Sequence, residues 1–259
     1  MGAGRIMIWT VPKSWAGETC VILAGGPSLE GWDLSSIREP KHQPFEYDRP
    51  RIITVNDSWR LAPWADVCFF QDTVWWHISV ISNRRSEDGK CDFADMRRRG
   101  FWVQGAKDAN MRDHAQIHTL TTREGNCIGL EENPSALAHG CNSGYAAINL
   151  AYHFGVKRII LLGYDMRVSG HRTNWHAEPR QTASAYAETI RHSMLPYFAM
   201  PVTDSSGKVI RPSLVDALRE KGVEVINSTP GSALKCWPYV PFPEVLNDER
   251  GKVVAPTQR

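Results

Sequence analysis

The chain has 259 residues, enough for one large α/β domain or two small ones, and a chain of this length buries enough surface to fold without disulfide bonds. Its 30 lysines and arginines nearly balance its 28 aspartates and glutamates, for a net charge of +2, which excludes binding to polyanions through overall charge. It also lacks a Cys-x-x-Cys pair, an apolar run of roughly 18 residues and a signal-peptide core, which predicts a reduced, cytoplasmic protein with no membrane partner.

Short apolar runs that end at a glycine or a polar residue predict buried strands in the first half of the chain. These runs are residues 19–24, 51–55, 66–70 and 101–104. Pro27 suits the first turn of a helix, so a short helix is expected from Ser28. Apart from the fourth run, the sequence at about 78–118 is charged and weakly periodic, which predicts an excursion from the sheet.

The second half of the chain shows the order helix, glycine, apolar strand twice. Aromatic and apolar residues recur at helical spacing before Gly155, which suits a left-handed C-cap, and an apolar strand is expected at 158–162. A second helix is expected from residue 214, and Gly222 separates it from a strand at 223–226. This alternation predicts a single α/β domain with a doubly wound, mostly parallel sheet of the Rossmann-like kind.

We expect residues 1–235 to form this domain and residues 236–259 to form a C-terminal arm. The arm contains four of the sixteen prolines, which predicts an extended segment lying over the domain or a partner; a homo-oligomer formed through the arm is one interpretation. Within the charged excursion, Arg97, Arg98 and Arg99 either contact the phosphates of a polyanionic acceptor such as DNA or form a solvated helix face.

Polar residues or glycines follow five of the predicted strands, and a parallel sheet brings such strand ends to the edge where ligands bind. Glycines let backbone N–H groups approach a phosphate or ribose, while Asn, Gln and Asp bind hydroxyls and base edges. Each group alone is also ordinary turn chemistry, but their coincidence predicts a nucleotide pocket. The groups are Gly25-Gly26-Pro27-Ser28, Asn56-Asp57, Gln71-Asp72, Gly163-Tyr164-Asp165 and residues 227–231.

Several familiar signatures are missing from the sequence. It contains no GxxxxGK[ST], GxGxxG or GxSxG, which argues against a P-loop kinase, a dinucleotide oxidoreductase and an α/β hydrolase. It also contains no HExxH or clear DxD pair, so no metal site is expected; Asp72 or Asp165 alone remains as a ligand for a divalent ion.

Four blocks resemble, in the same order, the bacterial sialyltransferases of glycosyltransferase family 42 and the related 6-hydroxymethylpterin diphosphokinase-like proteins. The blocks are LAGGPSLEGWDL, ITVNDSW, FFQD and GCNSGYAAINLAYHFGVKRIILLGYDM. The resemblance implies a phage or bacterial transferase with a glycosyltransferase-A-like variant of the fold. Residues 1–235 are then its nucleotide-binding transferase domain.

The resemblance and the strand ends together indicate the residues that bind the donor. Two departures from the sialyltransferases are Gly25, where they have an asparagine, and residues 203–206, where their catalytic histidine has no counterpart. The predicted donor-binding residues are Gly25, Gly26, Pro27, Ser28, Asn56, Asp57, Gln71, Asp72, Asn142, Ser143 and Gly144.

Glycosyl transfer needs a group that takes the proton of the acceptor, and the loop after the strand at 158–162 supplies two histidines. His176 is the expected base, with His171 or Glu178 assisting, and Asp165 is the third catalytic candidate. Both histidines are equally interpretable as surface loop residues.

These features predict a glycosyltransferase that moves a sugar from a nucleotide-sugar donor to an acceptor hydroxyl on a glycan, a protein or a modified DNA base. No cofactor is required by this reaction, and the need for a divalent metal stays open. One alternative is ATP-dependent pyrophosphoryl transfer to a pterin-like alcohol, which requires Mg²⁺. A second alternative is a nucleotide- or nucleic-acid-binding module without chemistry.

Overall fold

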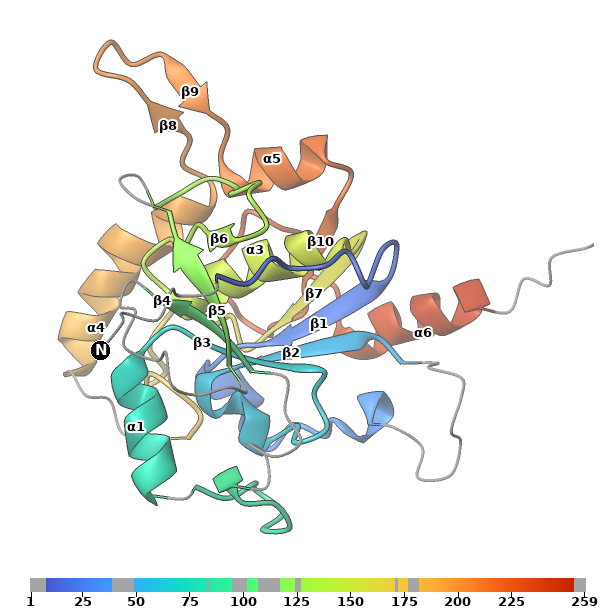
Figure 1. The fold of residues 1–259 in the computed structure, drawn as a ribbon. Coiled ribbons are helices and arrows are strands. Elements are labelled where there is room, and N and C mark those ends of the chain that lie inside the picture. Colours follow the sequence, from blue (N-terminus) through green and yellow to red (C-terminus); the bar gives the residue numbers. More distant parts are fainter. Residues whose placement is uncertain are drawn as a thin grey trace, which may run out of the picture.

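Eight parallel strands form the central sheet of the protein (Figure 1). The computed structural model describes residues 8–38, 49–82, 84–94, 102–106, 117–123, 127–170, 172–176 and 182–253. The strands of the sheet are β1 (Thr19–Leu23), β2 (Arg51–Val55), β3 (Val67–Phe70), β4 (Trp102–Ala106), β5 (Ile117–Thr122), β6 (Ala136–Leu137), β7 (Arg158–Leu162) and β10 (Glu224–Asn227). The predicted α/β class and its parallel, Rossmann-like sheet are confirmed.

Helices and short helical turns connect these strands. The α-helices are α1 (Thr73–Ser82), α3 (Ser143–Phe154), α4 (Ala183–Thr189), α5 (Leu214–Glu220) and α6 (Phe242–Val253). The 3₁₀ turns are η1 (Pro27–Leu29), η2 (Ser35–Ile37), η3 (Asn56–Arg60) and η6 (Leu195–Phe198), and η5 (Ile190–Met194) is a π-helical turn. A separate antiparallel hairpin consists of β8 (Val202–Thr203) and β9 (Val209–Arg211).

The order of the strands creates a point where the chain reverses its direction across the sheet. The order is β10-β7-β1-β2-β3-β4-β5-β6, and every neighbouring pair is parallel. From β1 the chain proceeds outward to β6, returns through α3, and continues with β7 on the other side of β1. Ligands of open α/β sheets bind at the carboxyl ends of strands beside such a switch point. The expected position for a site is therefore the loops after β1, β2 and β7.

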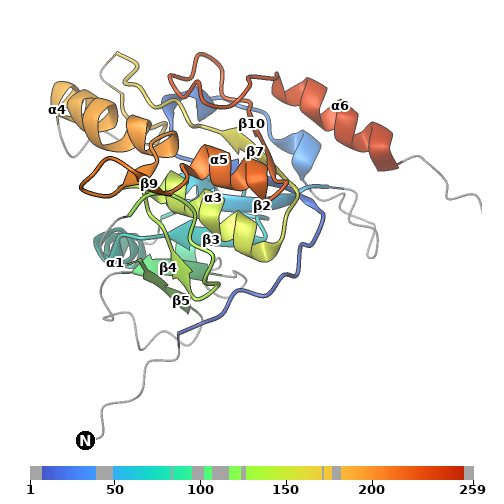
Figure 2. The same ribbon diagram turned by 90° about the horizontal axis from the view of Figure 1, so that it is seen from above.

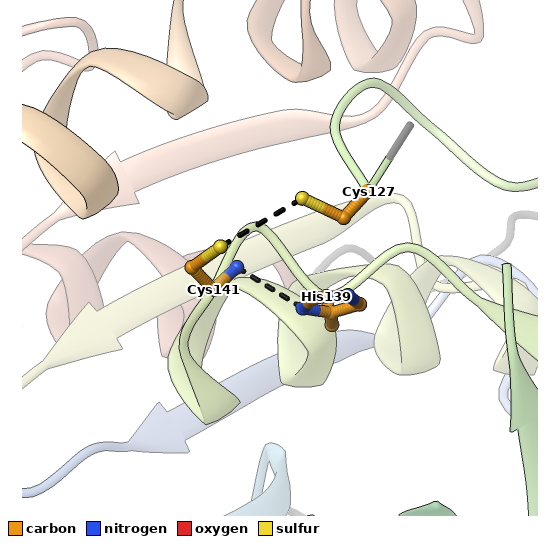
Figure 3. Close-up of side chains that lie close together, drawn as sticks. All are labelled: Cys127, His139 and Cys141. Carbon is orange, nitrogen blue, oxygen red and sulfur yellow. Dashed lines mark hydrogen bonds between the residues drawn. The ribbon is translucent and has the colours of Figure 1, made fainter. Parts of the chain in front are cut away.

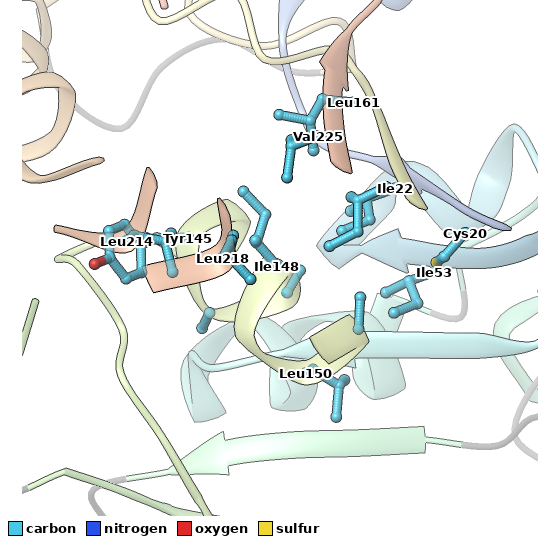
Figure 4. Close-up of a cluster of buried hydrophobic side chains, with 14 of the residues drawn as sticks. Cys20, Ile22, Ile53, Tyr145, Ile148, Leu150, Leu161, Leu214, Leu218 and Val225 are labelled. Atoms are coloured by element: carbon cyan, nitrogen blue, oxygen red, sulfur yellow. The ribbon is translucent and has the colours of Figure 1, made fainter. Parts of the chain in front are cut away.

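Helix α3 covers one face of the sheet because its sequence fixes both ends and one apolar side. The Asn142 side chain accepts a hydrogen bond from the Tyr145 N–H at 2.7 Å, and Gly155 ends the helix with a φ of 88°, as predicted. Tyr145 and Ile148 of α3 are fully buried in one cluster with side chains of β1, β2, β7 and α5 (Figure 4). Figures 1 and 2 show α3 and α5 on the same side of the sheet.

The opposite face of the sheet is covered by η2, the loops around it and α6. Phe242, Val245 and Leu246 of α6 pack in one buried cluster with the alternate side chains of β1 and β7. The expectation of an extended arm is therefore wrong for the segment that forms α6. The prolines of this segment had suggested an extended chain. Pro243, however, lies in the first turn of the helix, where a missing N–H group breaks no hydrogen bond within the helix.

Two further segments differ from the simple pattern expected from the sequence. The interval 78–118, expected as an excursion from the sheet, includes the end of α1 and all of β4. The strand expected at 101–104 corresponds to β4, which lies inside the sheet between β3 and β5. The arginines at 97–99 lie outside the described residues. The sequence did not predict β5 and β6; in β5 only Leu120 is fully buried. Within the described ranges, no helix is long and apolar enough to cross a membrane.

Candidate functional site

A cleft of about 440 Å³ opens at the carboxyl ends of β1, β2, β3 and β7, beside the switch point of the sheet. Most of the site residues predicted from the sequence line it: Gly25, Gly26, Asn56, Asp57, Asp72, Asn142, Ser143, Gly144, Asp165 and His176. Of the described candidates, Pro27, Ser28 and Gln71 do not line it. His171 and Glu178 lie outside the described residues. Four of the five strand-end groups expected from the sequence thus contribute to the cleft, whereas residues 227–231, after β10, do not line it.

The loop after β1 and the loop after β7 are joined by a buried carboxylate. Asp165 accepts the Ser28 N–H at 3.1 Å and the Ser28 hydroxyl at 2.7 Å, and the Gly26 N–H donates to the Gly163 carbonyl at 2.9 Å. Burial raises the pKa of Asp165, while the two hydrogen bonds from Ser28 oppose that rise. Ser28 therefore supports the floor of the cleft through Asp165.

A second buried carboxylate, that of Asp57 at the end of β2, is surrounded by three side chains. The Trp75 indole N–H donates to Asp57 Oδ2 at 2.9 Å, and the Arg84 guanidinium forms an ion pair with Oδ1. His176 Nδ1 lies 3.5 Å from Asp57 Oδ2. Only 2% of the Asp57 side chain is exposed, so its charge is balanced by these groups rather than by water. Trp75 thus supports a carboxylate, whereas its neighbour Trp76 stacks on Phe70 in the core.

The loop that carries His176 is tied down by the residue before it. The Trp175 N–H donates to the Gly25 carbonyl at 3.1 Å, and its indole N–H donates to Ser58 Oγ at 3.3 Å. Ser58 in turn donates to the Ala24 carbonyl at 2.6 Å. The Trp175 ring also contacts the His176 ring edge-on, with the centroids 5.1 Å apart. These contacts hold the imidazole of His176 over the ends of β1 and β2.

The surroundings of His176 favour its neutral form. Burial lowers the pKa of His176 below its usual value of 6.5; Asp57 opposes this effect, and Arg84 and Arg60 add to it. At neutral pH the imidazole is therefore an uncharged group beside a carboxylate. In the unfolded chain His176 has its usual pKa, so the unfolded chain binds a proton on this imidazole more tightly than the folded protein does. The stability contributed by the neutral form is therefore fully present above the usual pKa, and it is lost as the pH falls through the lowered pKa of the folded protein.

We expect the pKa of His176 to respond in opposite directions to two neighbouring substitutions. Asp57→Asn removes the negative charge that favours the imidazolium and lowers the pKa further, whereas Arg84→Gln removes a positive charge and raises it. An NMR titration of the imidazole signals measures both pKa values, with His176→Gln identifying the signal. Shifts in the same direction in both variants would contradict the placement of His176 between these charges.

Asn56 has two features that point to a ligand. Its φ of 51° lies in the left-handed region, which costs free energy for a residue other than glycine and recurs at functional sites. Its side-chain oxygen is buried and has no hydrogen-bond partner within the described part of the chain. Met166, after β7, also lines the cleft and has a φ of 48°. A donor group on a bound molecule would satisfy the Asn56 oxygen.

The N-terminus of α3 forms another part of the cleft wall. Ser143 and Gly144 line the cleft, and the first N–H groups of a helix have no acceptor within it. The Gly144 carbonyl accepts the Tyr164 hydroxyl at 2.9 Å, which fixes the helix start against the end of β7. The helix dipole and these N–H groups favour a negatively charged ligand group here.

One wall of the cleft comes from outside the sheet and was not expected from the sequence. Tyr186 in α4 and Ile190 and Met194 in η5 recur every four residues and line the cleft together. Arg84 and Arg167 were also missed as cleft residues. Arg84 follows α1 in the charged interval, where nothing distinguishes it from its arginine neighbour, and only the fold brings it to Asp57.

Comparisons with other proteins leave the family expected from the sequence untested. The chain matches none of the protein-family models, curated proteins or solved structures compared with it. The resemblance to glycosyltransferase family 42 therefore stays a prediction from four sequence blocks, and the geometry of the cleft carries the functional argument.

Proposed function

We propose that the protein is a glycosyltransferase that binds a nucleotide-sugar in the cleft and transfers its sugar to an acceptor hydroxyl. The observation that carries this proposal is that one cleft holds both a helix start suited to an anion and a neutral imidazole beside a buried carboxylate. The first suits the phosphates of a donor and the second suits the removal of a proton.

The donor would contact the strand ends and α3. Its phosphates fit the N-terminal N–H groups of α3, with the exposed Arg167 at the same cleft as a further source of positive charge. The unpartnered oxygen of Asn56 would accept a hydrogen bond from a ribose hydroxyl or a base amino group. Gly25 and Gly26 also line the cleft at the end of β1, where the donor would pass. The absence of a Cβ at Gly26 lets the loops after β1 and β7 come together beneath it.

His176 would act as the base in this reaction. With Nδ1 facing Asp57, Nε2 is the nitrogen that receives the proton of the acceptor hydroxyl. The acceptor oxygen then bonds to the anomeric carbon, and the bond from that carbon to the donor phosphate breaks. The nucleotide leaves with the electron pair, and the imidazolium is stabilised by the buried charge of Asp57. The 3.5 Å separation is longer than a strong hydrogen bond, as is common before a substrate is bound.

Pyrophosphoryl transfer from ATP is the second candidate, and the carboxylates of the cleft favour it less. That reaction needs carboxylate or other oxygen ligands for Mg²⁺. Three carboxylates line the cleft, but Asp57 is paired with Arg84 and Asp165 accepts two hydrogen bonds from Ser28. Asp72 caps α1 by accepting the Val74 N–H at 2.8 Å. With its carboxylates engaged in this way, the cleft suits a donor whose leaving nucleotide would be stabilised by the N–H groups of α3 and by arginines.

Thermal unfolding with a panel of nucleotides tests the proposal. We expect at least one of UDP, GDP, CMP or their sugar conjugates to raise the melting temperature without Mg²⁺, because a ligand at 100 times its Kd adds about 2.7 kcal/mol to the free energy of unfolding. Asn56→Gly is the matched variant, because glycine keeps the left-handed φ while removing the side-chain oxygen; it should melt normally and respond less to the nucleotide.

Two results would count against the sugar donor. Stabilisation by ATP alone, and only with Mg²⁺, would favour pyrophosphoryl transfer. If no nucleotide shifted the melting temperature at millimolar concentration, the cleft would not be a nucleotide site.

A further inference from the structure

Two cysteines and a histidine meet at the turn before α3: His139 and Cys141 belong to the turn, and Cys127 comes from the segment before it (Figure 3). Cys127 Sγ and Cys141 Sγ lie 3.8 Å apart, and one ligand atom from each of Cys127, His139 and Cys141 lies within 4.8 Å of the others. The sequence contains no recognisable metal-binding spacing for these residues, because the fold rather than the local sequence brings Cys127 to the turn. The cluster is separate from the histidine and carboxylates of the cleft.

We propose that Cys127, His139 and Cys141 bind one Zn²⁺ ion. Zinc takes thiolate and imidazole ligands in a tetrahedral arrangement, with zinc–sulfur distances of about 2.3 Å. Two sulfurs at that distance from a tetrahedral ion lie about 3.8 Å apart, the separation that the two cysteines already have. A disulfide would instead need the sulfurs at about 2.05 Å, so the cysteines are spaced for a shared ion rather than for a bond to each other.

The backbone holds the three side chains together before any ion binds. The Gly140 N–H donates to the Cys127 carbonyl at 2.9 Å, which ties the two segments directly, and the Asn142 N–H donates to the His139 carbonyl at 2.9 Å. Gly140 and Cys141 have φ values of 47° and 59°, so two successive residues are in the left-handed region. For Cys141 this conformation carries a cost, which is typical of residues held for a function.

Tyr145 closes the turn from the other side. A Cβ on Gly140 would lie 2.2 Å from the Tyr145 ring, so only glycine allows the turn to approach α3 this closely. The Tyr145 hydroxyl donates to the Gly129 carbonyl at 3.2 Å, and this bond fixes the segment that follows Cys127. Both segments that supply ligands are therefore anchored on the same buried ring, which reduces the entropy lost when an ion is bound.

The chemistry of the ligands selects the ion. Sulfur ligands disfavour Mg²⁺ and Ca²⁺, which prefer oxygen, and two thiolates balance the charge of Zn²⁺. His139 Nδ1 accepts the Cys141 N–H at 3.2 Å, so this nitrogen has a lone pair directed at the turn, and coordination would replace that hydrogen bond. Cys141 is exposed, so water can fill the fourth position of the tetrahedron. Binding releases the two thiol protons, and the affinity should therefore rise with pH.

The site would order the start of α3. Cys141 directly precedes Asn142, Ser143 and Gly144, which line the cleft. An ion that fixes Cys141 against Cys127 would hold these residues without touching the ligand of the cleft. The proposal does not depend on the reaction of the cleft, because the ligands and their geometry are independent of it.

Zinc and cobalt titrations of the reduced, chelator-treated full chain test the proposal. We expect one equivalent of Zn²⁺ to bind in competition with a chromophoric chelator. Co²⁺ in its place should give a sulfur-to-cobalt charge-transfer band and the strong visible bands of a tetrahedral ion. Cys127→Ser and Cys141→Ser should each lower the affinity for Zn²⁺ by about 100-fold or more, since even residues behind the ligands contribute 10- to 100-fold.

Cys236→Ser is the matched control, because Cys236 is a half-buried free cysteine outside the cluster and its loss should leave zinc binding unchanged. The proposal is overturned if the reduced chain binds less than one equivalent, or if all three cysteine variants bind zinc equally well. Should the cluster variants fail to fold, the cobalt spectrum of the unaltered chain decides alone: octahedral bands without sulfur charge transfer would refute the site.

Discussion

Replacing Gly26 with alanine is expected to cost roughly 3 kcal/mol or more of the free energy of unfolding, at the upper end of the range for overpacking substitutions. A Cβ on Gly26 would lie 1.9 Å from Asp165 Oδ2 and 2.4 Å from the Gly163 carbonyl oxygen. Neither atom can move cheaply, because the carbonyl belongs to the backbone after β7 and the carboxylate is held by two hydrogen bonds from Ser28. Urea unfolding followed by circular dichroism measures the loss.

Gly25→Ala is the matched control for this substitution. Its Cβ would meet only the side chain of Asn174, at 3.1 Å from Oδ1, and this half-buried amide is the end of a side chain that can shift by a few tenths of an ångström. We expect this variant to lose less than about 1 kcal/mol, as most tolerated substitutions do. Equal stability of the two alanine variants would show that the loops after β1 and β7 are not pressed together as described.

Replacing His176 with alanine is expected to lower the turnover number by about 10²- to 10⁴-fold, the usual contribution of a general base. The fold and the affinity for the nucleotide should change little, because Trp175 rather than His176 anchors the loop, through Gly25 and Ser58. The release of nucleotide from the sugar donor, identified by its thermal stabilisation, measures the turnover. Nucleotide binding is measured on the same samples.

His192→Ala serves as the comparison, since His192 is exposed and pairs with Glu188 at the surface. It should keep its turnover, and the ratio of the two variants isolates the effect of a histidine in the cleft. Undiminished turnover in His176→Ala would assign the base to another residue. A loss of nucleotide binding that matches the loss of turnover would make His176 a donor-binding residue instead.

The sequence predicted the inner strands well because burial on both faces of a parallel sheet demands an unbroken apolar run. β2 and β7 have the predicted bounds, and β1 and β3 differ by one residue. The strands β5 and β6 were not predicted from the sequence. β5 is only half-buried along most of its length, so it shows no apolar run, and β6 has only two residues. α6 was predicted as extended because the prolines of residues 236–259 were counted without regard to position; the one proline within the helix, Pro243, lies in its first turn.

The site was predictable as far as topology determines it. Residues that directly follow neighbouring parallel strands, such as Gly25, Asn56 and Asp165, must lie at the same edge once the sheet is parallel, and all three line the cleft. Arg84 was not predictable, because it reaches Asp57 only through the path of the chain after α1. The cluster of Cys127, His139 and Cys141 was missed for the same reason: its spacing matches no known metal-binding motif, and only the fold brings Cys127 against the turn that carries the other two.

Substitutions in the helical wall formed by Tyr186, Ile190 and Met194 should have a different effect from substitutions at the strand ends. Side chains on the wall project from a connecting segment, so their replacement reshapes the cleft without breaking any hydrogen bond that joins the strand ends. Alterations at Gly26 or Asp165, in contrast, disturb the scaffold itself. Relatives that handle different molecules should therefore diverge first along α4 and η5, while the rim of the sheet stays the same.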